Sequence, residues 1–234
     1  MINQAIILAG GLGTRLREAV PDLPKCMAPV AGRPFIAYLI DYYTRQGIEN
    51  YIFSLGYKHE VIEAFLKDYY PSLQYVVSIE DEPLGTGGAI KKACAISKPG
   101  NVLVLNGDTL FKVNVKDLAR FHVSHNSDCT LSLKPMTNSD RYGVVQLNGD
   151  HSIHSFMEKK WYAESLINGG AYVLNPADFL DDDLPMKFSF EKDYLEQYFH
   201  LEEMFGFVQD AYFIDIGIPG DFEKAQTELP ANLF

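Results

Sequence analysis

Apolar positions in the first half of the chain alternate between two patterns. Short runs rich in β-branched and aromatic residues are typical of buried strands, and four occur, at Gln4–Ala9, Tyr51–Leu55, Gln74–Ile79 and Asn101–Leu105. Segments with helical spacing separate these runs and predict helices over Pro34–Gln46, Lys58–Asp68, Thr86–Ser97 and Lys116–Ser124. Strands that alternate with helices of this length predict βαβ units on a parallel sheet.

The second half of the chain has strand-like runs that lie closer together. They are Cys129–Lys134, Gly143–Leu147, Ser152–Phe156 and Ile167–Val173, with Asn148-Gly149 as a hairpin turn. We expect a helix over Phe190–Phe199 capped by Ser189, a last helix near Pro219, and a solvated loop at Asp181–Asp183. No repeat or linker interrupts the chain. The pattern predicts one α/β domain over residues 1–234, a Rossmann-like, mainly parallel sheet flanked by helices (about 1–125) with a mixed-sheet extension (about 126–234).

Composition agrees with an ordinary globular protein. The chain has 234 residues, of which 47% are hydrophobic and 22% charged, so it can fold without a disulfide or a structural metal. Its three cysteines, Cys26, Cys94 and Cys129, form no CxxC pair, which argues against a zinc module and a secreted disulfide framework. We find no signal peptide and no apolar stretch of membrane-spanning length, and therefore expect a cytoplasmic protein without a membrane partner.

Charge is distributed unevenly along the sequence. The formal net charge is −11, which argues against a nucleic-acid partner, yet residues 1–33 carry a net +2. A basic island beside glycines suits a small polyphosphate, although charge alone favours a solvated loop.

The richest segment is the glycine loop Leu8–Leu16 (LAGGLGTRL), which follows the first predicted strand. Bare backbone amides in such turns cradle phosphates. No GKS or GKT ends the loop, and the third glycine of a dinucleotide fingerprint would fall at Leu16, so neither of those motifs is present. Arg15 inside the turn and Lys25 ten residues later add the positive charge that a triphosphate needs.

Together, Leu8–Leu16 and Pro24–Val30 (PKCMAPV) resemble the signature of the sugar-1-phosphate nucleotidylyltransferases. Further motifs of that family follow in the same order along nearly the whole chain: Glu82–Ala89 (EPLGTGGA), Asn106–Asp108 (NGD), Tyr142–Val145 (YGVV), Glu158-Lys159 (EK), Asn168–Gly170 (NGG) and Asp215–Pro219 (DIGIP). Two departures, Leu16–Val20 (LREAV) where many relatives have RLxPxT and Ile218 in place of threonine, lie beside the residues that the chemistry needs.

The resemblance implies an enzyme that joins a nucleoside triphosphate to a sugar 1-phosphate and releases pyrophosphate. The implied nucleotide contacts are Leu8, Ala9, Gly10, Gly11, Gly13, Thr14, Arg15, Glu82, Gly85, Thr86 and Gly87. The implied sugar-phosphate contacts are Asn106, Gly143, Glu158, Lys159, Asn168 and Gly170. Arg15, Lys25 and Lys159 are the catalytic candidates: Arg15 for the leaving phosphates, Lys25 for the α-phosphate and Lys159 for the attacking sugar phosphate. Asp108 and Asp215, each at a predicted strand end, suit one Mg²⁺ ion, which accepts one or two carboxylates besides phosphates and waters.

The substrates are less tightly specified than the reaction. The short length and Phe188–Asp193 (FSFEKD) resemble a small bacterial branch for which we expect GTP and D-glycero-α-D-manno-heptose 1-phosphate, and the small residues of the 82–88 loop suit a purine. Uridylyl transfer to an amino-sugar phosphate, guanylyl transfer to mannose 1-phosphate and cytidylyl transfer to phosphocholine remain open. A regulatory homologue that binds nucleotide without turnover is also an open alternative. The sequence leaves open whether the chain forms a homo-oligomer.

Other features have plainer explanations. His122/His125 and His151/His154 have no neighbours that complete a zinc site, so we expect no zinc. Asp181–Asp183 contains the DxD pattern of glycosyltransferases, but no strand precedes it. Phe205, Phe207, Tyr212 and Phe213 are expected to belong to the core rather than to an interface.

Overall fold

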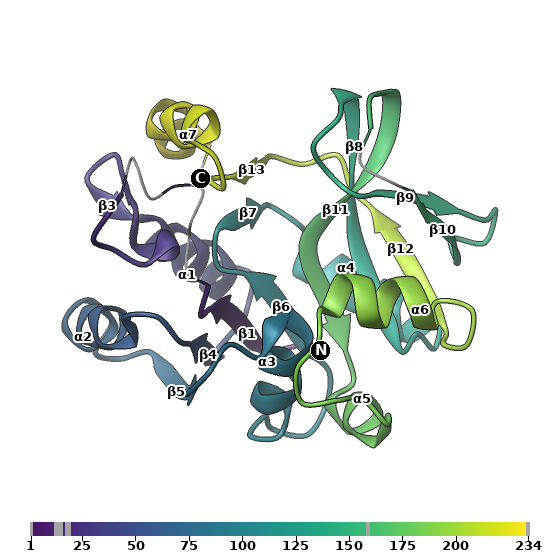
Figure 1. The fold of residues 1–234 in the computed structure, drawn as a ribbon, viewed down its shortest axis with the longest axis horizontal. Helices are drawn as coiled ribbons and strands as arrows, with labels where there is room; N and C mark the ends of the chain where they lie inside the picture. Colours follow the sequence, from purple (N-terminus) through teal and green to yellow (C-terminus); the bar gives the residue numbers. More distant parts are fainter. Residues whose placement is uncertain (1, 12–15, 17–19, 158–159, 233–234) are drawn as a thin grey trace.

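The central sheet of the protein is mainly parallel on one side and antiparallel on the other (Figure 1). The computed structural model describes residues 2–11, 16, 20–157 and 160–232. Strands β1 (Gln4–Ala9), β4 (Asn50–Leu55), β5 (Gln74–Ile79) and β6 (Val102–Asn106) pair in parallel in the order β5-β4-β1-β6. The four predicted strands of the first half are therefore confirmed, and with them the α/β class.

Helices cover both faces of this sheet. Side chains of β1 alternate between two cores: Ile7 joins the core beneath α1 (Phe35–Arg45), α2 (His59–Tyr69) and α4 (Val115–Ser124), whereas Ile6 joins the core beneath α3 (Gly85–Cys94) and α5 (Pro176–Asp181). Successive side chains of a strand point to opposite faces, and both faces here are buried, which explains the nearly continuous apolar runs of the sequence. The four predicted helices of the first half are confirmed.

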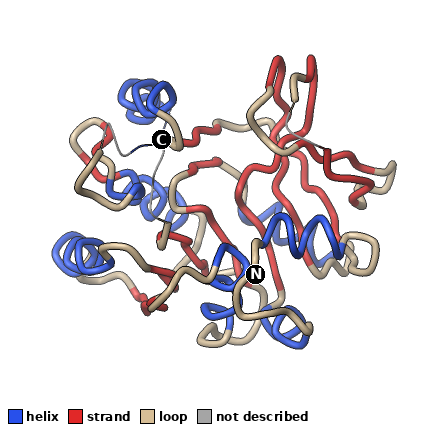
Figure 2. The backbone as a smooth tube through the Cα atoms, in the orientation of Figure 1, coloured by secondary structure: helices blue, strands red, loops and turns tan. Residues whose placement is uncertain are grey.

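The antiparallel extension is built around one long strand. β11 (Tyr162–Leu174) pairs with β6 through Ala171–Leu174, and with β8 (Cys129–Ser139) along its other edge. The hairpin of β9 (Val144–Leu147) and β10 (Ile153–Met157) is confirmed around Asn148-Gly149. β11 pairs with strands of both parts and so connects the extension to the parallel sheet (Figure 2).

The sequence predicts no range for several short strands, although it places Asp215 at a strand end. β12 (Met204–Val208) pairs in parallel with β8, and a bridge between Ser152 and Phe205 brings it back against the β9–β10 hairpin. β13 (Phe213–Asp215) pairs with β7 (Thr109–Phe111), and β2 (Pro29–Val30) pairs with β3 (Arg33–Pro34). Strands of two to five residues carry too little periodicity to be recognised. As expected, the aromatic side chains of this region belong to the core: Phe205 is buried, and Phe207, Tyr212 and Phe213 are partly buried against the core.

The C-terminal helices differ from the prediction in one respect. The helix expected over Phe190–Phe199 is a π-helix, η3 (Phe190–Leu195), followed by a short α-helix, α6 (Glu196–Tyr198). Its Ser189 cap is confirmed, since the hydroxyl accepts a hydrogen bond from the Lys192 amide. The last helix, α7, runs from Pro219 to Asn232. Within the described residues, no helix combines the length and the apolar character that crossing a membrane requires.

The first turn of α3 lies tightly against the segment that precedes η3. A Cβ atom at Gly88 would lie 2.3 Å from the carbonyl oxygen of Met186, and one at Gly87 would overlap the ring of Phe188. Gly87 N–H donates to the carbonyl oxygen of Phe188 at 3.0 Å. The glycines of this turn therefore have a packing reason, because they let two backbones touch.

Gly88→Ala is expected to destabilise the protein by about 1–3 kcal/mol, because the added methyl overlaps backbone that cannot move aside. Helix propensity alone predicts the opposite sign, a gain of about 1 kcal/mol. Gly220→Ala in α7 is the matched control, since a Cβ atom there would have no neighbour within 4 Å. Urea unfolding of both variants measures the difference, and a stabilised Gly88→Ala protein would contradict this packing.

Candidate active site

Three predicted site residues meet at the carboxyl edge of the sheet. Lys25 opens the short 3₁₀ helix η2 (Lys25–Met27), Asp108 occupies the turn between β6 and β7, and Asp215 ends β13. The pairing of β7 with β13 places Asp215 opposite Thr109. Lys25 Nζ contacts Asp108 Oδ2 and lies 3.8 Å from Asp215 Oδ1. One ammonium thus faces two carboxylates that are far apart in the sequence.

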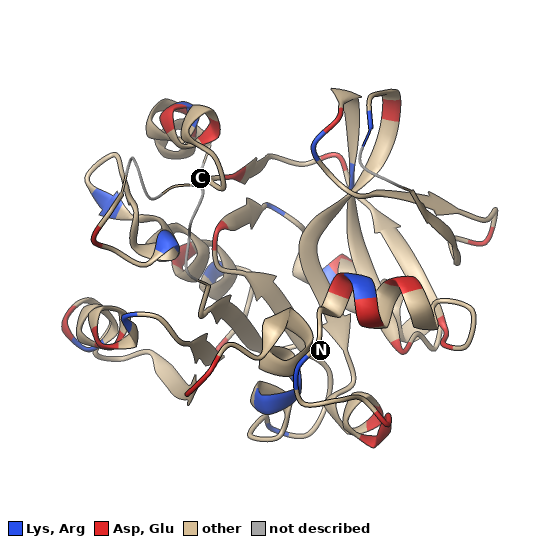
Figure 3. Cartoon of the chain, viewed as in Figure 1, with Lys and Arg blue, Asp and Glu red and all other residues tan. Residues whose placement is uncertain are grey.

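The acidic pair is partly shielded from water. The side chains of Lys25, Asp108 and Asp215 are 19%, 32% and 24% exposed. Burial and the neighbouring Asp108 charge raise the pKa of Asp215, against the opposing effects of Lys25 and of the Gly217 N–H, which donates to Asp215 Oδ1 at 2.7 Å. Figure 3 shows this acidic position at the end of β13, with further ones on α7. The site therefore holds negative charge that a cation relieves.

The geometry fits a divalent cation of the magnesium type. Two carboxylates already share one cationic group, and no group of three or more His, Cys, Asp or Glu side chains arranged for a metal occurs among the described residues. Mg²⁺ commonly uses only one or two carboxylates and completes its shell with phosphates and waters. Gly217 keeps the space open, because a Cβ atom there would lie 2.9 Å from Lys25 Nζ.

The described part of the glycine loop begins directly beside this centre. Leu8 and Ala9 end β1, and the Gly107 N–H donates to the Leu8 carbonyl oxygen at 2.9 Å. A Cβ atom at Gly10 would lie 2.4 Å from Glu80 Oε1, so only glycine fits there without displacing that carboxylate. A Cβ atom at Gly11, the next residue, would have no atom of the described residues within 4 Å. The predicted contacts Gly13, Thr14 and Arg15 lie outside the described residues.

The loop predicted to hold the base has both engaged and free groups. The Thr86 hydroxyl donates to Glu191 Oε2 and accepts from the Phe190 amide, each at 2.8 Å. Gly85 has a φ of +74° and, like Gly87, lies against Phe188. The Glu82 carboxylate is exposed and has no ion-pair or hydrogen-bond partner among the described residues. Glu82 is therefore the group in this loop that is free to contact a base.

The predicted sugar contacts that the structure describes lie close together, and we call Asn106, Gly143, Asn168 and Gly170 the sugar floor. Asn168 donates from Nδ2 to the Tyr172 hydroxyl at 2.9 Å and accepts at Oδ1 from the Gly170 amide at 3.0 Å. Its own amide donates to the Gly143 carbonyl oxygen at 3.2 Å. Gly170 has a φ of +70°, and a Cβ atom there would lie 2.7 Å from Asn106 Nδ2. The structure thus brings Asn106, Gly143, Asn168 and Gly170 together, whereas Glu158 and Lys159 lie outside the described residues.

Three residues near these groups were not assigned from the sequence. Tyr172 is buried beside Asn168, Glu191 contacts Thr86, and Arg141 forms an ion pair with Asp221. Glu191 lies within the Phe188–Asp193 segment, but nothing in the sequence showed which residue it would contact. The contacts of Glu191 and Arg141 join segments distant along the chain, which no local pattern reveals, whereas Tyr172 and Asn168 are four residues apart in β11.

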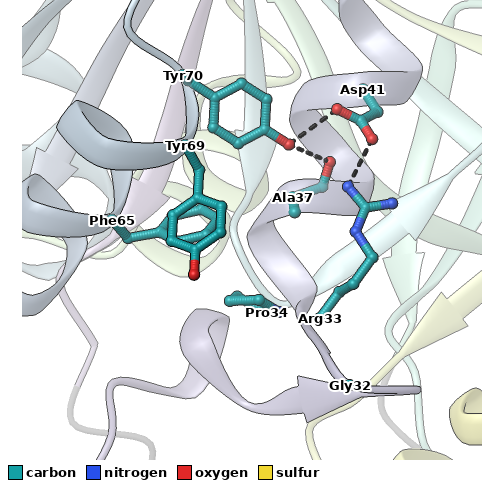
Figure 4. A pocket seen from close by; sticks show the side chains of 8 residues that line it. All are labelled: Gly32, Arg33, Pro34, Ala37, Asp41, Phe65, Tyr69 and Tyr70. Carbon is teal, nitrogen blue, oxygen red and sulfur yellow. Dashed lines mark hydrogen bonds and ion pairs between the residues drawn. The ribbon is translucent and has the colours of Figure 1, made fainter.

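A cavity of about 370 Å³ lies elsewhere, between α1 and α2 (Figure 4). Arg33 and Asp41 pair across its wall at 2.7 Å, and the Tyr70 hydroxyl donates to Asp41 at 2.8 Å. None of the predicted site residues lines it. The charged groups of this cavity satisfy one another, so it is not the candidate active site.

Comparison with known proteins agrees with this geometry. Residues 4–232 match the family described as nucleotidyl transferase, and the chain belongs to that family. It is 50% identical over 226 residues to D-glycero-alpha-D-manno-heptose 1-phosphate guanylyltransferase of Aneurinibacillus thermoaerophilus, covering 97% of this chain and 98% of that one. The enzyme of the same name from Campylobacter jejuni is 44% identical, with 94% and 96% covered.

A solved structure is similar over the same extent. HddC from Yersinia pseudotuberculosis is 38% identical with a TM-score of 0.89, covering 97% of this chain and 99% of that chain. HddC in complex with GMP-PN gives a TM-score of 0.87. The predicted family and fold are therefore confirmed by independent comparisons of sequence and structure.

The histidines considered for zinc have structural explanations. His122 is 3% exposed, and its Nδ1 lies 2.9 Å from the Thr130 hydroxyl. Burial lowers the pKa of His122 to about 4. His125 stacks on Phe121 with ring centroids 4.0 Å apart, and His151 meets the same ring edge-on. His122 thus packs between α4 and β8, and His125 and His151 pack against Phe121.

The shift at His122 predicts how stability depends on pH. Its pKa is about 4 when folded and about 6.5 when unfolded, so the unfolded chain binds more protons between these values. Stability is fully present above about pH 6.5 and falls toward pH 4, by about 3 kcal/mol from this group. Unfolding of His122→Gln at both pH values should show a much smaller loss, while His154→Gln, at an exposed position, keeps the wild-type loss. Equal losses in wild type and His122→Gln would refute this assignment.

Proposed function

We propose that this chain transfers GMP from GTP to D-glycero-α-D-manno-heptose 1-phosphate, giving the GDP-sugar and pyrophosphate. A phosphate oxygen of the sugar 1-phosphate attacks the α-phosphorus of GTP; that P–O bond forms while the bond to the bridging β-phosphate oxygen breaks. The observation that carries the proposal is full-length similarity, 50% identity over 97% of this chain, to a guanylyltransferase for this sugar. The complex of HddC with GMP-PN supports a guanine nucleotide.

The acidic centre, formed by Asp108 and Asp215 around Lys25, suits such an in-line displacement. Two anions must approach each other, and the protein must reduce their repulsion and hold both in register. Lys25, which faces both carboxylates, supplies a point charge that we assign to the α-phosphate. We assign Arg15 to the departing phosphates and Lys159 to the sugar phosphate. Each of the three lysine and arginine side chains thereby offsets charge on a different part of the reacting assembly.

Members of this family generally use a divalent metal ion, and we propose Mg²⁺ held by Asp108 and Asp215. When bound, the ion neutralises the phosphate oxygens and helps to align them. The two aspartates orient it from opposite strands, since Asp108 precedes β7 and Asp215 ends its partner β13. Their shared contact with Lys25 supports a common cation site.

The remaining residues divide between the two substrates. We assign Leu8, Ala9, Gly10, Gly11, Gly13 and Thr14 to the phosphates and ribose, and Glu82, Gly85, Thr86 and Gly87 to the region of the base. We assign Asn106, Gly143, Glu158, Asn168 and Gly170 to sugar hydroxyls. The connected hydrogen bonds from Gly143 through Asn168 to Gly170 support this, because a sugar needs polar groups held in fixed positions.

A substrate matrix tests the proposal directly. Pyrophosphate release is measured with Mg²⁺ for GTP, UTP, dTTP, CTP and ATP against heptose, mannose, glucose and N-acetylglucosamine 1-phosphates. The highest kcat/KM is expected for GTP with heptose 1-phosphate. A higher value for UTP or dTTP, or for another sugar phosphate, would overturn the substrate assignment. No turnover with any pair would favour a homologue that binds nucleotide without catalysis.

Substitution of the aspartates tests the shared metal ion. Asp108→Asn and Asp215→Asn should each remove most turnover, and the double variant should be hardly worse than either single one, because one ion needs both ligands. If Asp215 only caps the turn before α7, its replacement should cost about 1 kcal/mol of stability or less and leave the Mg²⁺ dependence unchanged. Near-normal turnover of folded Asp215→Asn protein at saturating Mg²⁺ would exclude the shared site.

Glu82 provides a test of base selectivity. A free carboxylate complements the two adjacent donors of guanine, N1–H and the 2-amino group, which the other bases do not offer side by side. Glu82→Gln should therefore lower the preference for GTP over UTP by about tenfold or more, mainly through KM. Asp81→Asn changes an adjacent exposed acid and serves as the control. An unchanged preference in Glu82→Gln would remove this residue from base recognition.

A further inference from the structure

The turn between β8 and β9 contacts helix α7 through a side-chain ion pair. Arg141 lies in this turn (residues 140–143), and its Nη1 donates to Asp221 Oδ2 at 2.6 Å. Asp221 stands in the first turn of α7, 80 positions further along the chain. Among the ion pairs of the described residues, this is the one that joins the extension to α7.

The Asp221 end of this pair is firmly anchored. Ala225 and Leu229 of α7 are fully buried in the core that also contains α1. The Gln226 side chain accepts from the Ala31 amide at 2.8 Å and donates to the Pro29 carbonyl oxygen at 3.0 Å. α7 is thus fixed to the parallel half of the fold, and Asp221 with it.

The turn that carries Arg141 lies between the acidic centre and the sugar floor. The Tyr142 ring meets Phe213 edge-on, with centroids 5.5 Å apart, two residues before Asp215. Burial, followed by the Asp215 charge, raises the pKa of Tyr142 to about 12. On the other side, the Gly143 carbonyl oxygen accepts the hydrogen bond from Asn168. Movement of this turn would therefore displace Gly143 of the sugar floor and the Tyr142 ring on the side of the acidic centre.

We propose that Arg141 is a positioning residue, which through Asp221 holds the 140–143 turn in register with the Asp108–Asp215 centre. The substrate in this proposal, a sugar 1-phosphate, rests on the proposed function. Arg141 acts on Tyr142 and Gly143, and these in turn define where the sugar 1-phosphate lies relative to the α-phosphate of the nucleotide. The pair thus aligns one substrate and leaves the other unaffected.

The exposure of the pair predicts an unusual combination of effects. The Arg141 and Asp221 side chains are 37% and 23% exposed, and ion pairs this accessible add little to global stability. Misplacing a reacting group by about 1 Å can nevertheless lower a rate by about 100-fold. Loss of the pair should therefore reduce turnover while the protein stays folded.

The test combines two single variants with their double variant and a charge exchange. Arg141→Met and Asp221→Asn should each lower kcat/KM for the sugar 1-phosphate by about tenfold or more, and the double variant should be no worse, because each single change already breaks the pair. Arg141→Asp combined with Asp221→Arg should recover a large part of the loss. Binding of GTP alone, measured by calorimetry, and the thermal midpoint should stay close to wild type.

Two results would overturn the proposal. If Arg141→Met is impaired and Asp221→Asn is normal, Arg141 acts without its partner, by contact with a phosphate. If the two losses multiply in the double variant, the residues act independently. Arg120→Met breaks the exposed pair between Arg120 and Asp117 in α4 and is the matched control, with activity expected to be unchanged.

A measurement without substrate separates this proposal from the proposed function. Amide hydrogen exchange at residues 143–145 should be faster in Arg141→Met and Asp221→Asn than in wild type, and unchanged in Arg120→Met. If wild type does not convert GTP and heptose 1-phosphate, the proposed function fails, and exchange still decides whether the pair positions the turn. Equal exchange in all four proteins would contradict positioning whatever the substrate is.

Discussion

The arrangement of the site depends on one electrostatic constraint, the approach of Asp108 and Asp215 to a common cation. Two carboxylates that lie this close repel each other, and burial raises the cost of keeping both ionised. Lys25 relieves that repulsion through its contacts with both side chains. The pairing of β7 with β13, the glycine at position 217 and the placement of η2 all serve to bring these three charges together.

Because of this constraint, the acidic centre requires residues from both halves of the chain. The parallel half contributes Lys25 and Asp108, whereas Asp215 comes from β13, near the end of the second half. β11 pairs with β6 through Ala171–Leu174 and with β9 at Ile167, so the strand that carries Asn168 and Gly170 pairs directly with the strand that precedes Asp108.

Glycine has distinct uses in different parts of the site. Gly107 allows the end of β6 to approach the end of β1 closely, and Gly10 leaves room for the Glu80 carboxylate and the Gly56 backbone beside the predicted phosphate loop. At Gly87 and Gly88 it lets α3 pack on Phe188 and Met186, so a motif that resembles a base-binding loop is also a packing motif. The Glu82 carboxylate of the same loop is exposed and has no ion-pair or hydrogen-bond partner among the described residues.

The sequence by itself determined the α/β class, the four parallel strands with their helices and the family, because burial on both sheet faces and a glycine turn after a strand leave local patterns. The ordered motifs that resemble the nucleotidylyltransferase family also singled out Lys25, Asp108 and Asp215. Only the tertiary structure decided that one ammonium joins both acids, that short strands β12 and β13 complete the fold, and that Arg141 meets Asp221. These contacts join segments about 80 or more residues apart, and pairing over such distances is set by packing of the whole chain rather than by any periodicity within it.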